Sequence, residues 1–79
     1  MDELQQRLVK CFECVFPSLP AEEITRSSQA TNSAWDSVAA ITLANTVEDE
    51  FGFQLDLDLL PELNSFDRIL SYVKKETQA

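Results

Sequence analysis

The sequence predicts an all-α fold, a small four-helix bundle with three main helices and one short helix. Apolar residues recur at spacings of three and four in three stretches, which is the pattern of helices that bury one face. The chain has one glycine and three prolines, too few for the many turns of an all-β fold. Its 79 residues and 44 % hydrophobic content predict a single domain over residues 1–79 with a modest core.

The first predicted helix begins near Asp2, which can cap it, and ends before Pro17. Its apolar stripe consists of Leu4, Leu8, Cys11, Phe12, Val15 and Phe16. Cys11 and Cys14 lie three residues apart inside this helix, and the chain has no histidine or further cysteine to complete a zinc site. Cys11 is therefore expected to be a small core residue.

Residues 17–35 form a long connection that is rich in turn-forming residues. A single helical turn is predicted at Ala21–Ile24, with Pro20 at its first position. Three apolar residues are expected to pin the connection to the core, namely Leu19, Ile24 and Trp35.

The second main helix is predicted over Ser37–Phe51, with Asp36 as its N-cap and Gly52 as the residue that ends it. Its inward positions are predicted to be Ile41, Ala44, Val47 and Phe51, flanked by Val38 and Leu43. Glu48, Asp49 and Glu50 crowd the last turn, where negative charge opposes the helix dipole. This arrangement costs stability and suggests a reason other than folding, such as a basic partner. The alternative is a solvated acidic face.

Polar and apolar residues alternate from Phe53 to Leu63, but no second strand is available to pair with this segment. We therefore predict a loop with a short helical turn near Asp56–Leu60. The acids of this segment lack the glycine that a calcium loop needs, so no metal site is expected. The last helix is predicted to begin near Ser65, its cap, with Phe66, Ile69, Leu70 and Val73 facing inward.

The charge pattern excludes several classes of partner. The net charge is −8, and eight acids but no lysine or arginine lie between Ser27 and Asp67. Such a surface repels nucleic acid and anionic membranes and attracts basic protein surfaces. No secretion signal or membrane-spanning stretch is recognisable, so we expect a cytoplasmic protein without stable membrane association. No nucleophile–base pair is present, so we expect no enzymatic activity.

Ser37 is the residue that these patterns single out. It opens an acidic amphipathic helix after a long loop, with no base nearby to activate it, which indicates a site of modification rather than a catalyst. The run Trp35-Asp36-Ser37-Val38, then Ile41, Ala44, Val47 and Glu48-Asp49-Glu50-Phe51-Gly52, resembles the acyl carrier proteins. Their signature is Asp-Ser-Leu at the start of a helix that ends in acids and an aromatic residue. The resemblance extends over nearly the whole chain.

This resemblance implies that Ser37 receives a 4′-phosphopantetheine arm from coenzyme A, added by a phosphopantetheinyl transferase. The thiol of the arm would hold acyl groups as thioesters, and Asp36 would cap the helix beside the site and help position the metal-bound substrate of the transferase. It further implies a free-standing, monomeric carrier in fatty-acid, polyketide or another specialised biosynthesis. Its other partners would be acyl-loading and acyl-processing enzymes with basic docking patches. Partner contacts are expected at Val38, Thr42, Glu48, Asp49, Leu57 and Leu59.

Several positions depart from the family pattern. Ala39 and Thr42 stand where many relatives carry acids, and Leu57 and Leu59 occupy a short helix that is usually acidic. These departures favour a specialised pathway, although Leu57 and Leu59 can equally pack into the core. Two alternatives stay open, a peptidyl or aminoacyl carrier and an unmodified acidic helical adaptor that binds a basic partner. An adaptor does not need the Ser37 hydroxyl, whereas a carrier has no activity without it.

Overall fold

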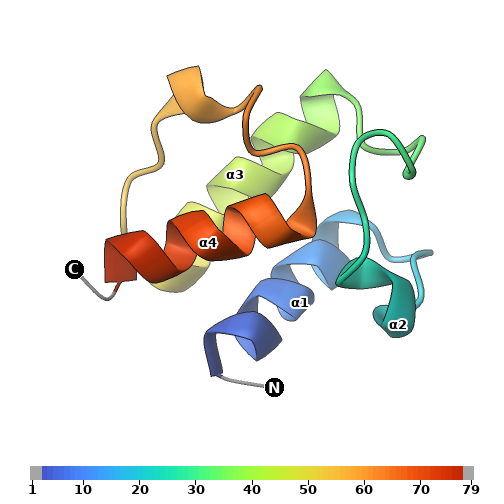
Figure 1. Ribbon diagram of the computed structural model, residues 1–79, viewed down its shortest axis with the longest axis horizontal. Coiled ribbons are helices and arrows are strands. Elements are labelled where there is room, and N and C mark those ends of the chain that lie inside the picture. Colours follow the sequence, from blue (N-terminus) through green and yellow to red (C-terminus); the bar gives the residue numbers. More distant parts are fainter. Residues whose placement is uncertain (1–2, 78–79) are drawn as a thin grey trace.

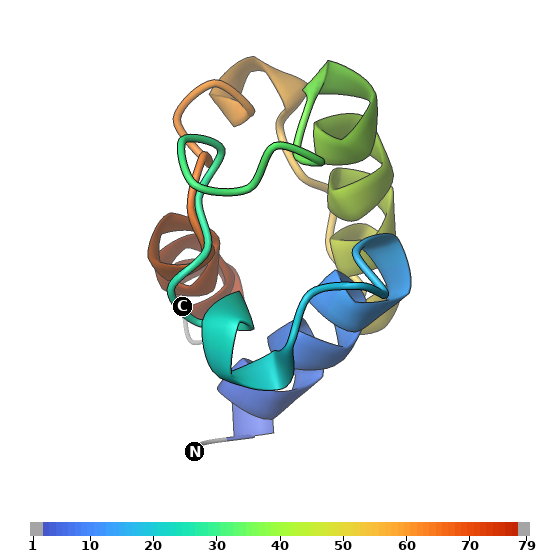
Figure 2. The ribbon, with the colours of Figure 1, turned by 90° about the vertical axis from the view of Figure 1, so that its right-hand side faces the viewer.

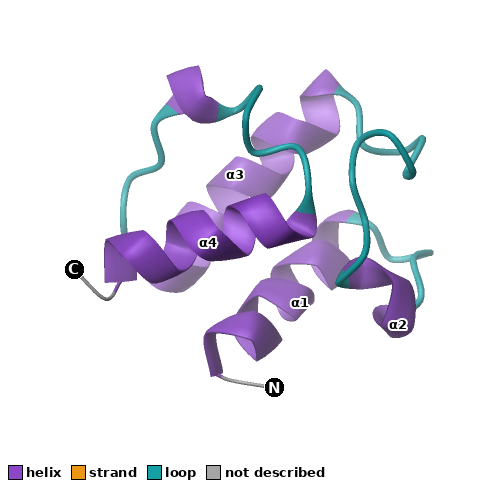
Figure 3. Ribbon diagram, in the orientation of Figure 1, coloured by secondary structure: helices purple, strands orange, loops and turns teal. Residues whose placement is uncertain are grey.

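The computed structural model describes residues 3–77, except for the side chains of Ala21 and Leu57. All named elements in this range are helical, which confirms the predicted all-α class (Figure 3). The elements are α1 (Glu3–Val15), α2 (Ala21–Ile24), α3 (Ser37–Phe51), the 3-10 helix η1 (Leu57–Leu59) and α4 (Phe66–Thr77). The cap predicted at Asp2 lies outside the described residues. No helix in the described range is both long and apolar enough to cross a membrane.

The first helix is the centre of the arrangement, because α1 packs against α2, α3 and α4. In Figure 1, α4 crosses in front of α3 and α1 lies below both. Helix α1 buries the predicted Leu8, Cys11 and Phe12, and it also buries Val9, which the stripe did not include. A helix that contacts three others buries more than one narrow stripe, which explains the additional residue.

Aromatic rings form the middle of the core. The ring centroid of Phe12 lies 6.0 Å from that of Phe16, 5.4 Å from that of Trp35 and 5.1 Å from that of Phe66. Phe12 thereby joins α1, the long connection and α4. Ile24 is also fully buried, and Leu19 packs against the core, so the three predicted anchors of the connection are confirmed.

Helix α3 has the predicted bounds, but its inward face differs from the prediction. Leu43, Ala44 and Val47 are buried, whereas Ile41 is 49 % exposed. The expectation that Ile41 faces inward is therefore wrong. Apolar residues occur on both faces of this helix, so their spacing alone does not decide which set meets the core.

The helix ends follow the local signals in most cases. Gly52 ends α3 with φ +74°, a left-handed conformation that residues with a Cβ avoid. The Oγ atom of Ser65 accepts a hydrogen bond from the N–H of Arg68 at 3.2 Å and caps α4 as predicted. Pro20 differs from the prediction, since it precedes α2 in an extended conformation instead of occupying its first turn. The predicted turn at Ala21–Ile24 is confirmed, and Pro20 is its N-cap residue.

The acidic last turn of α3 has a role in folding that the sequence did not reveal. The Arg7 guanidinium lies 2.7 Å from the Glu50 carboxylate and 4.6 Å from the centroid of the Phe51 ring. The Glu48 carboxylate accepts a hydrogen bond from the N–H of Leu55 at 3.0 Å. The sequence predicted no contact within the fold for Glu48 or Glu50. They connect α3 to α1 and to the following loop.

The long connection is attached to the start of α4. Ser28 and Ser65 form an isolated antiparallel bridge. The N–H of Gln29 donates to the carbonyl of Asn64 at 2.9 Å, and that of Phe66 donates to the carbonyl of Ser27 at 3.0 Å. Figure 2 shows the connection rising from α2 to the first turn of α3. These bonds fix the segment that leads into Ser37.

Candidate functional site

Three consecutive residues build the site at the start of α3. Trp35 is buried against Phe12 and Phe16 and anchors the end of the connection in the core. Asp36 has an extended backbone, and its Oδ1 atom accepts a hydrogen bond from the N–H of Ala39 at 2.8 Å. Ser37 follows as the first helical residue and is exposed to solvent. The predicted cap is confirmed, and the serine is presented on a fixed helix end.

This end of α3 suits a phosphodiester. The N–H groups of the first turn of a helix have no preceding turn whose carbonyls could accept their hydrogen bonds. Here the Asp36 side chain accepts from the N–H of Ala39, and the Asp36 carbonyl accepts from the N–H of Ala40. The N–H groups of Ser37 and Val38 remain available to an anion, and the helix dipole favours negative charge there. No acidic side chain lies within the first turn itself. The residues present therefore fit a phosphate group attached to the Ser37 hydroxyl.

The Ser37 hydroxyl has no histidine beside it. The chain contains no histidine, and the Oδ1 atom of the neighbouring Asp36 is occupied by the Ala39 N–H. Nucleophilic catalysis needs a base within hydrogen-bonding distance of the hydroxyl. The structure thus presents an exposed Ser37 hydroxyl with no imidazole beside it.

An exposed helix face extends from Ser37 along α3. Among the described residues, Val38 and Ile41 are the large hydrophobic side chains that are exposed, at 73 % and 49 %. At about 100° per residue, Thr42, Asn45 and Asp49 share this side of the helix. We call these five exposed residues, Val38, Ile41, Thr42, Asn45 and Asp49, the α3 outer face. Ile41 and Asn45 were not predicted as partner contacts. They lie three and seven residues after Val38, a helical spacing that places them on the same face.

The remaining predicted partner contacts lie in different surroundings. Glu48 lies next to the α3 outer face and is half-buried. Its carboxylate accepts the hydrogen bond from the N–H of Leu55. Leu59 is half-buried and packs against the core. The side chain of Leu57 is outside the described part of the structure. The structure thus brings Val38, Thr42 and Asp49 together on one face and leaves Glu48 and Leu59 beside it.

The two cysteines differ in their surroundings. Cys11 is buried, as predicted, and Cys14 is exposed. Burial raises the pKa of the Cys11 thiol from 9.0 to about 11, and the nearby Glu50 and Cys14 add to this effect. A thiol with a raised pKa has little thiolate at neutral pH and is a poor nucleophile.

We therefore expect a selective reaction with iodoacetamide. Only Cys14 should be alkylated in the folded protein at pH 8, and both thiols should react in urea. Because the folded pKa of Cys11 lies above the unfolded one, its contribution to stability is complete below pH 9 and is lost as the pH rises towards 11. Peptide mapping by mass spectrometry measures the alkylation. Equal labelling of Cys11 and Cys14 at pH 8 without urea would contradict the buried position of Cys11.

No group of three or more potential metal ligands occurs among the described residues. Asp56, which the sequence places near two other acids, accepts a hydrogen bond from the N–H of Asp58 at 3.0 Å. Its carboxylate thereby stabilises the turn that contains η1.

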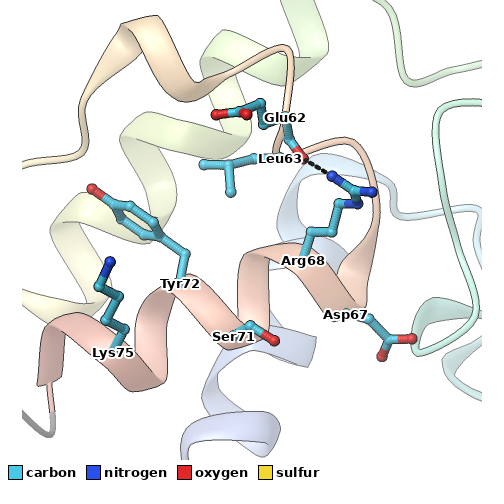
Figure 4. Close-up of a pocket in the computed structure, with 7 residues that line it drawn as sticks. All are labelled: Glu62, Leu63, Asp67, Arg68, Ser71, Tyr72 and Lys75. Atoms are coloured by element: carbon cyan, nitrogen blue, oxygen red, sulfur yellow. Dashed lines mark hydrogen bonds between the residues drawn. The ribbon is translucent and has the colours of Figure 1, made fainter.

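An open groove of about 370 Å³ runs along α4 (Figure 4). It is lined by Glu62, Leu63, Asp67, Arg68, Ser71, Tyr72 and Lys75. Arg68 donates a hydrogen bond to the carbonyl of Glu62 at 3.4 Å, and the two acids balance the charges of Arg68 and Lys75. Ser37 is not part of its lining.

One protein family matches most of the chain. The family described as "Phosphopantetheine attachment site" matches residues 6–73, which is well over half of the chain and includes all of α3 and most of α1 and α4. No curated protein and no solved structure matches the chain significantly.

Proposed function

Because the chain belongs to the phosphopantetheine-attachment family of carrier proteins, we propose that it carries acyl intermediates on an arm attached to Ser37. The observation that carries this proposal is an exposed serine at the first position of α3, directly after the capping Asp36. Members of this family interact with phosphopantetheinyl transferases and with biosynthetic enzymes. The same proposal includes a cytoplasmic, monomeric protein that has no catalytic activity of its own. It would act in fatty-acid, polyketide or other specialised synthesis.

The 4′-phosphopantetheine group supplies a terminal thiol that can hold an acyl group as a thioester. In the attachment step, the Ser37 oxygen bonds to the phosphorus that carries the pantetheine of coenzyme A, and adenosine 3′,5′-bisphosphate leaves. The serine proton passes to a base of the transferase, since the chain supplies none. The free N–H groups of Ser37 and Val38 then favour the phosphodiester, and the Asp36 cap holds the helix end in place.

Mass spectrometry tests the modification directly. After incubation with coenzyme A and a broad-specificity phosphopantetheinyl transferase, we expect each chain to gain the mass of one arm. The absence of any gain would contradict the carrier function and favour an unmodified adaptor.

We further propose that partner enzymes dock on the α3 outer face. Val38 and Ile41 expose apolar area within the first turns after Ser37. Asp49 lies about 18 Å farther along the helix axis than Ser37, because a helix rises about 1.5 Å per residue. A partner that contacts both ends needs an apolar patch near the serine and a basic group farther along. Buried apolar anchors slow dissociation, whereas charges at the rim mainly accelerate association.

A charge on this face should impair docking. Val38→Asp should lower kcat/KM for loading by the transferase about tenfold, because it places an unpaired charge in an apolar contact. The fold should persist, since Val38 is 73 % exposed. Gln54→Asp is the matched control, because it adds the same charge at an exposed loop position that is not part of this face. An equal loss in both variants would show that net charge, and not the outer face, controls docking.

A further inference from the structure

Arg7 of α1 reaches the acidic last turn of α3. Its Nε atom lies 2.7 Å from the Oε2 atom of Glu50, and its Nη2 atom donates to the main-chain carbonyl of the same residue. The guanidinium carbon lies 4.6 Å from the centroid of the Phe51 ring. A carboxylate, a carbonyl and an aromatic ring therefore hold one guanidinium group.

These contacts keep the Arg7–Glu50 ion pair in place, although its two side chains are 36 % and 39 % exposed. Most surface ion pairs are weak because two long side chains must be ordered to form them. Here the carbonyl and the ring order the arginine without help from the carboxylate, and the planar guanidinium suits both contacts. The negative charge of Glu50 is thus balanced at the surface of α3.

The other two acids of this turn differ in what they offer to a partner. Glu48 is half-buried, and its carboxylate accepts a hydrogen bond from the N–H of Leu55 at 3.0 Å. Asp49 is exposed, and its side chain has no hydrogen-bond or ion-pair partner among the described residues. Of the three acids, Asp49 is the one that combines an exposed side chain with an unbalanced charge.

The part of the α3 outer face that lies nearer to Ser37 carries no charge. Residues 38–47 include no acidic or basic side chain, and Val38 and Ile41 expose apolar surface. The Thr42 hydroxyl donates to the carbonyl of Val38 at 3.0 Å, so its proton is already in a hydrogen bond. The face therefore has an apolar part near the serine and a single unpaired carboxylate at its far end.

We propose that Arg7 determines which partners dock on this face, because it balances Glu50 and leaves Asp49 as the single point for a basic group. This proposal rests on the carrier function and on docking at the α3 outer face. The partner that fits has an apolar patch with one lysine or arginine at its edge. A partner with a cluster of basic groups would find one counter-charge and bring its other cations close to Arg7, where like charges repel. Arg7 acts through the charge of Glu50 and takes no part in bond making.

The rate of arm attachment tests this role, with a broad-specificity phosphopantetheinyl transferase that has a basic docking surface. Arg7→Gln should raise kcat/KM about threefold at low salt, because the unbalanced charge of Glu50 then attracts the basic surface. The difference should vanish at about 0.5 M salt, where charges are screened within a few ångströms. Arg7→Lys keeps the positive charge and should load at the rate of the parent.

Two further variants separate the ion pair from the net charge of the protein. Arg7→Gln combined with Glu50→Gln removes a balanced pair, so kcat/KM should return to the parent value. Arg26→Gln is the matched control, because it removes the same side chain from the long connection, outside α1 and α3, and it should raise kcat/KM much less. An equal increase in Arg7→Gln and Arg26→Gln would overturn the inference.

Glu50→Gln tests the same balance from the other side, even if Arg7→Gln does not fold. It leaves the charge of Arg7 unbalanced beside the docking face, so loading should slow about threefold at low salt. An unchanged rate in Glu50→Gln would overturn the role of the pair. Failure of the parent to accept any arm would instead refute the carrier function, so the two failures are distinguishable.

Discussion

Ser37→Ala should abolish attachment of the phosphopantetheine arm completely. Alanine lacks the oxygen that forms the phosphodiester, and no other serine of the chain occupies the first position of a long helix behind an aspartate cap. Mass spectrometry after treatment with coenzyme A and transferase should therefore show only the unmodified mass. The free energy of unfolding should change little, because alanine is well tolerated at an exposed helical position.

The matched control is Ser33→Ala, which removes an exposed hydroxyl from the connection four residues before the site. This variant should accept one arm as the parent does. Circular dichroism of both variants should match the parent, so that loss of loading cannot be attributed to unfolding. An arm on Ser37→Ala would place the attachment site elsewhere and refute our assignment.

The sequence predicted the serine site because its signals are local. An N-cap, a helix start and a glycine at the helix end each depend on residues a few positions apart, and the bounds of α3 were correct. The inward face of α3 was predicted less well. Ile41 lies three residues before the buried Ala44, so the helical repeat alone allows both residues to face inward. The packing of α1 against α3 decides that Ile41 points outward.

Contacts between distant segments could not be predicted from spacing. Arg7 and Glu50 are 43 residues apart, and nothing near either residue indicates the other. The same holds for the bridge between Ser28 and Ser65, which fixes the connection before the site. The sequence predicted that Trp35 is an anchor in the core, but the unpaired state of its indole N–H depends on the residues that surround it.

Phe12→Ala should have the largest effect on stability. Phe12 is fully buried and contacts three aromatic rings, which belong to Phe16, Trp35 and Phe66. Replacing a buried phenylalanine with alanine costs about 3–5 kcal/mol, because the removed ring leaves a cavity. A small domain has a total stability of about 5–15 kcal/mol, and a 79-residue chain is expected near the lower end. The variant should therefore be largely unfolded at 37 °C.

Phe53→Ala is the control for this prediction, because the same atoms are removed from a half-buried side chain at the edge of the core. Its ring contacts Phe51 and Tyr72, and the expected cost is about 1–2 kcal/mol. Urea denaturation followed by circular dichroism measures both variants. A similar loss for Phe12→Ala and Phe53→Ala would contradict a core centred on Phe12. The anchoring of Trp35 would then need another explanation, because Phe12 holds the indole that precedes Asp36 and Ser37.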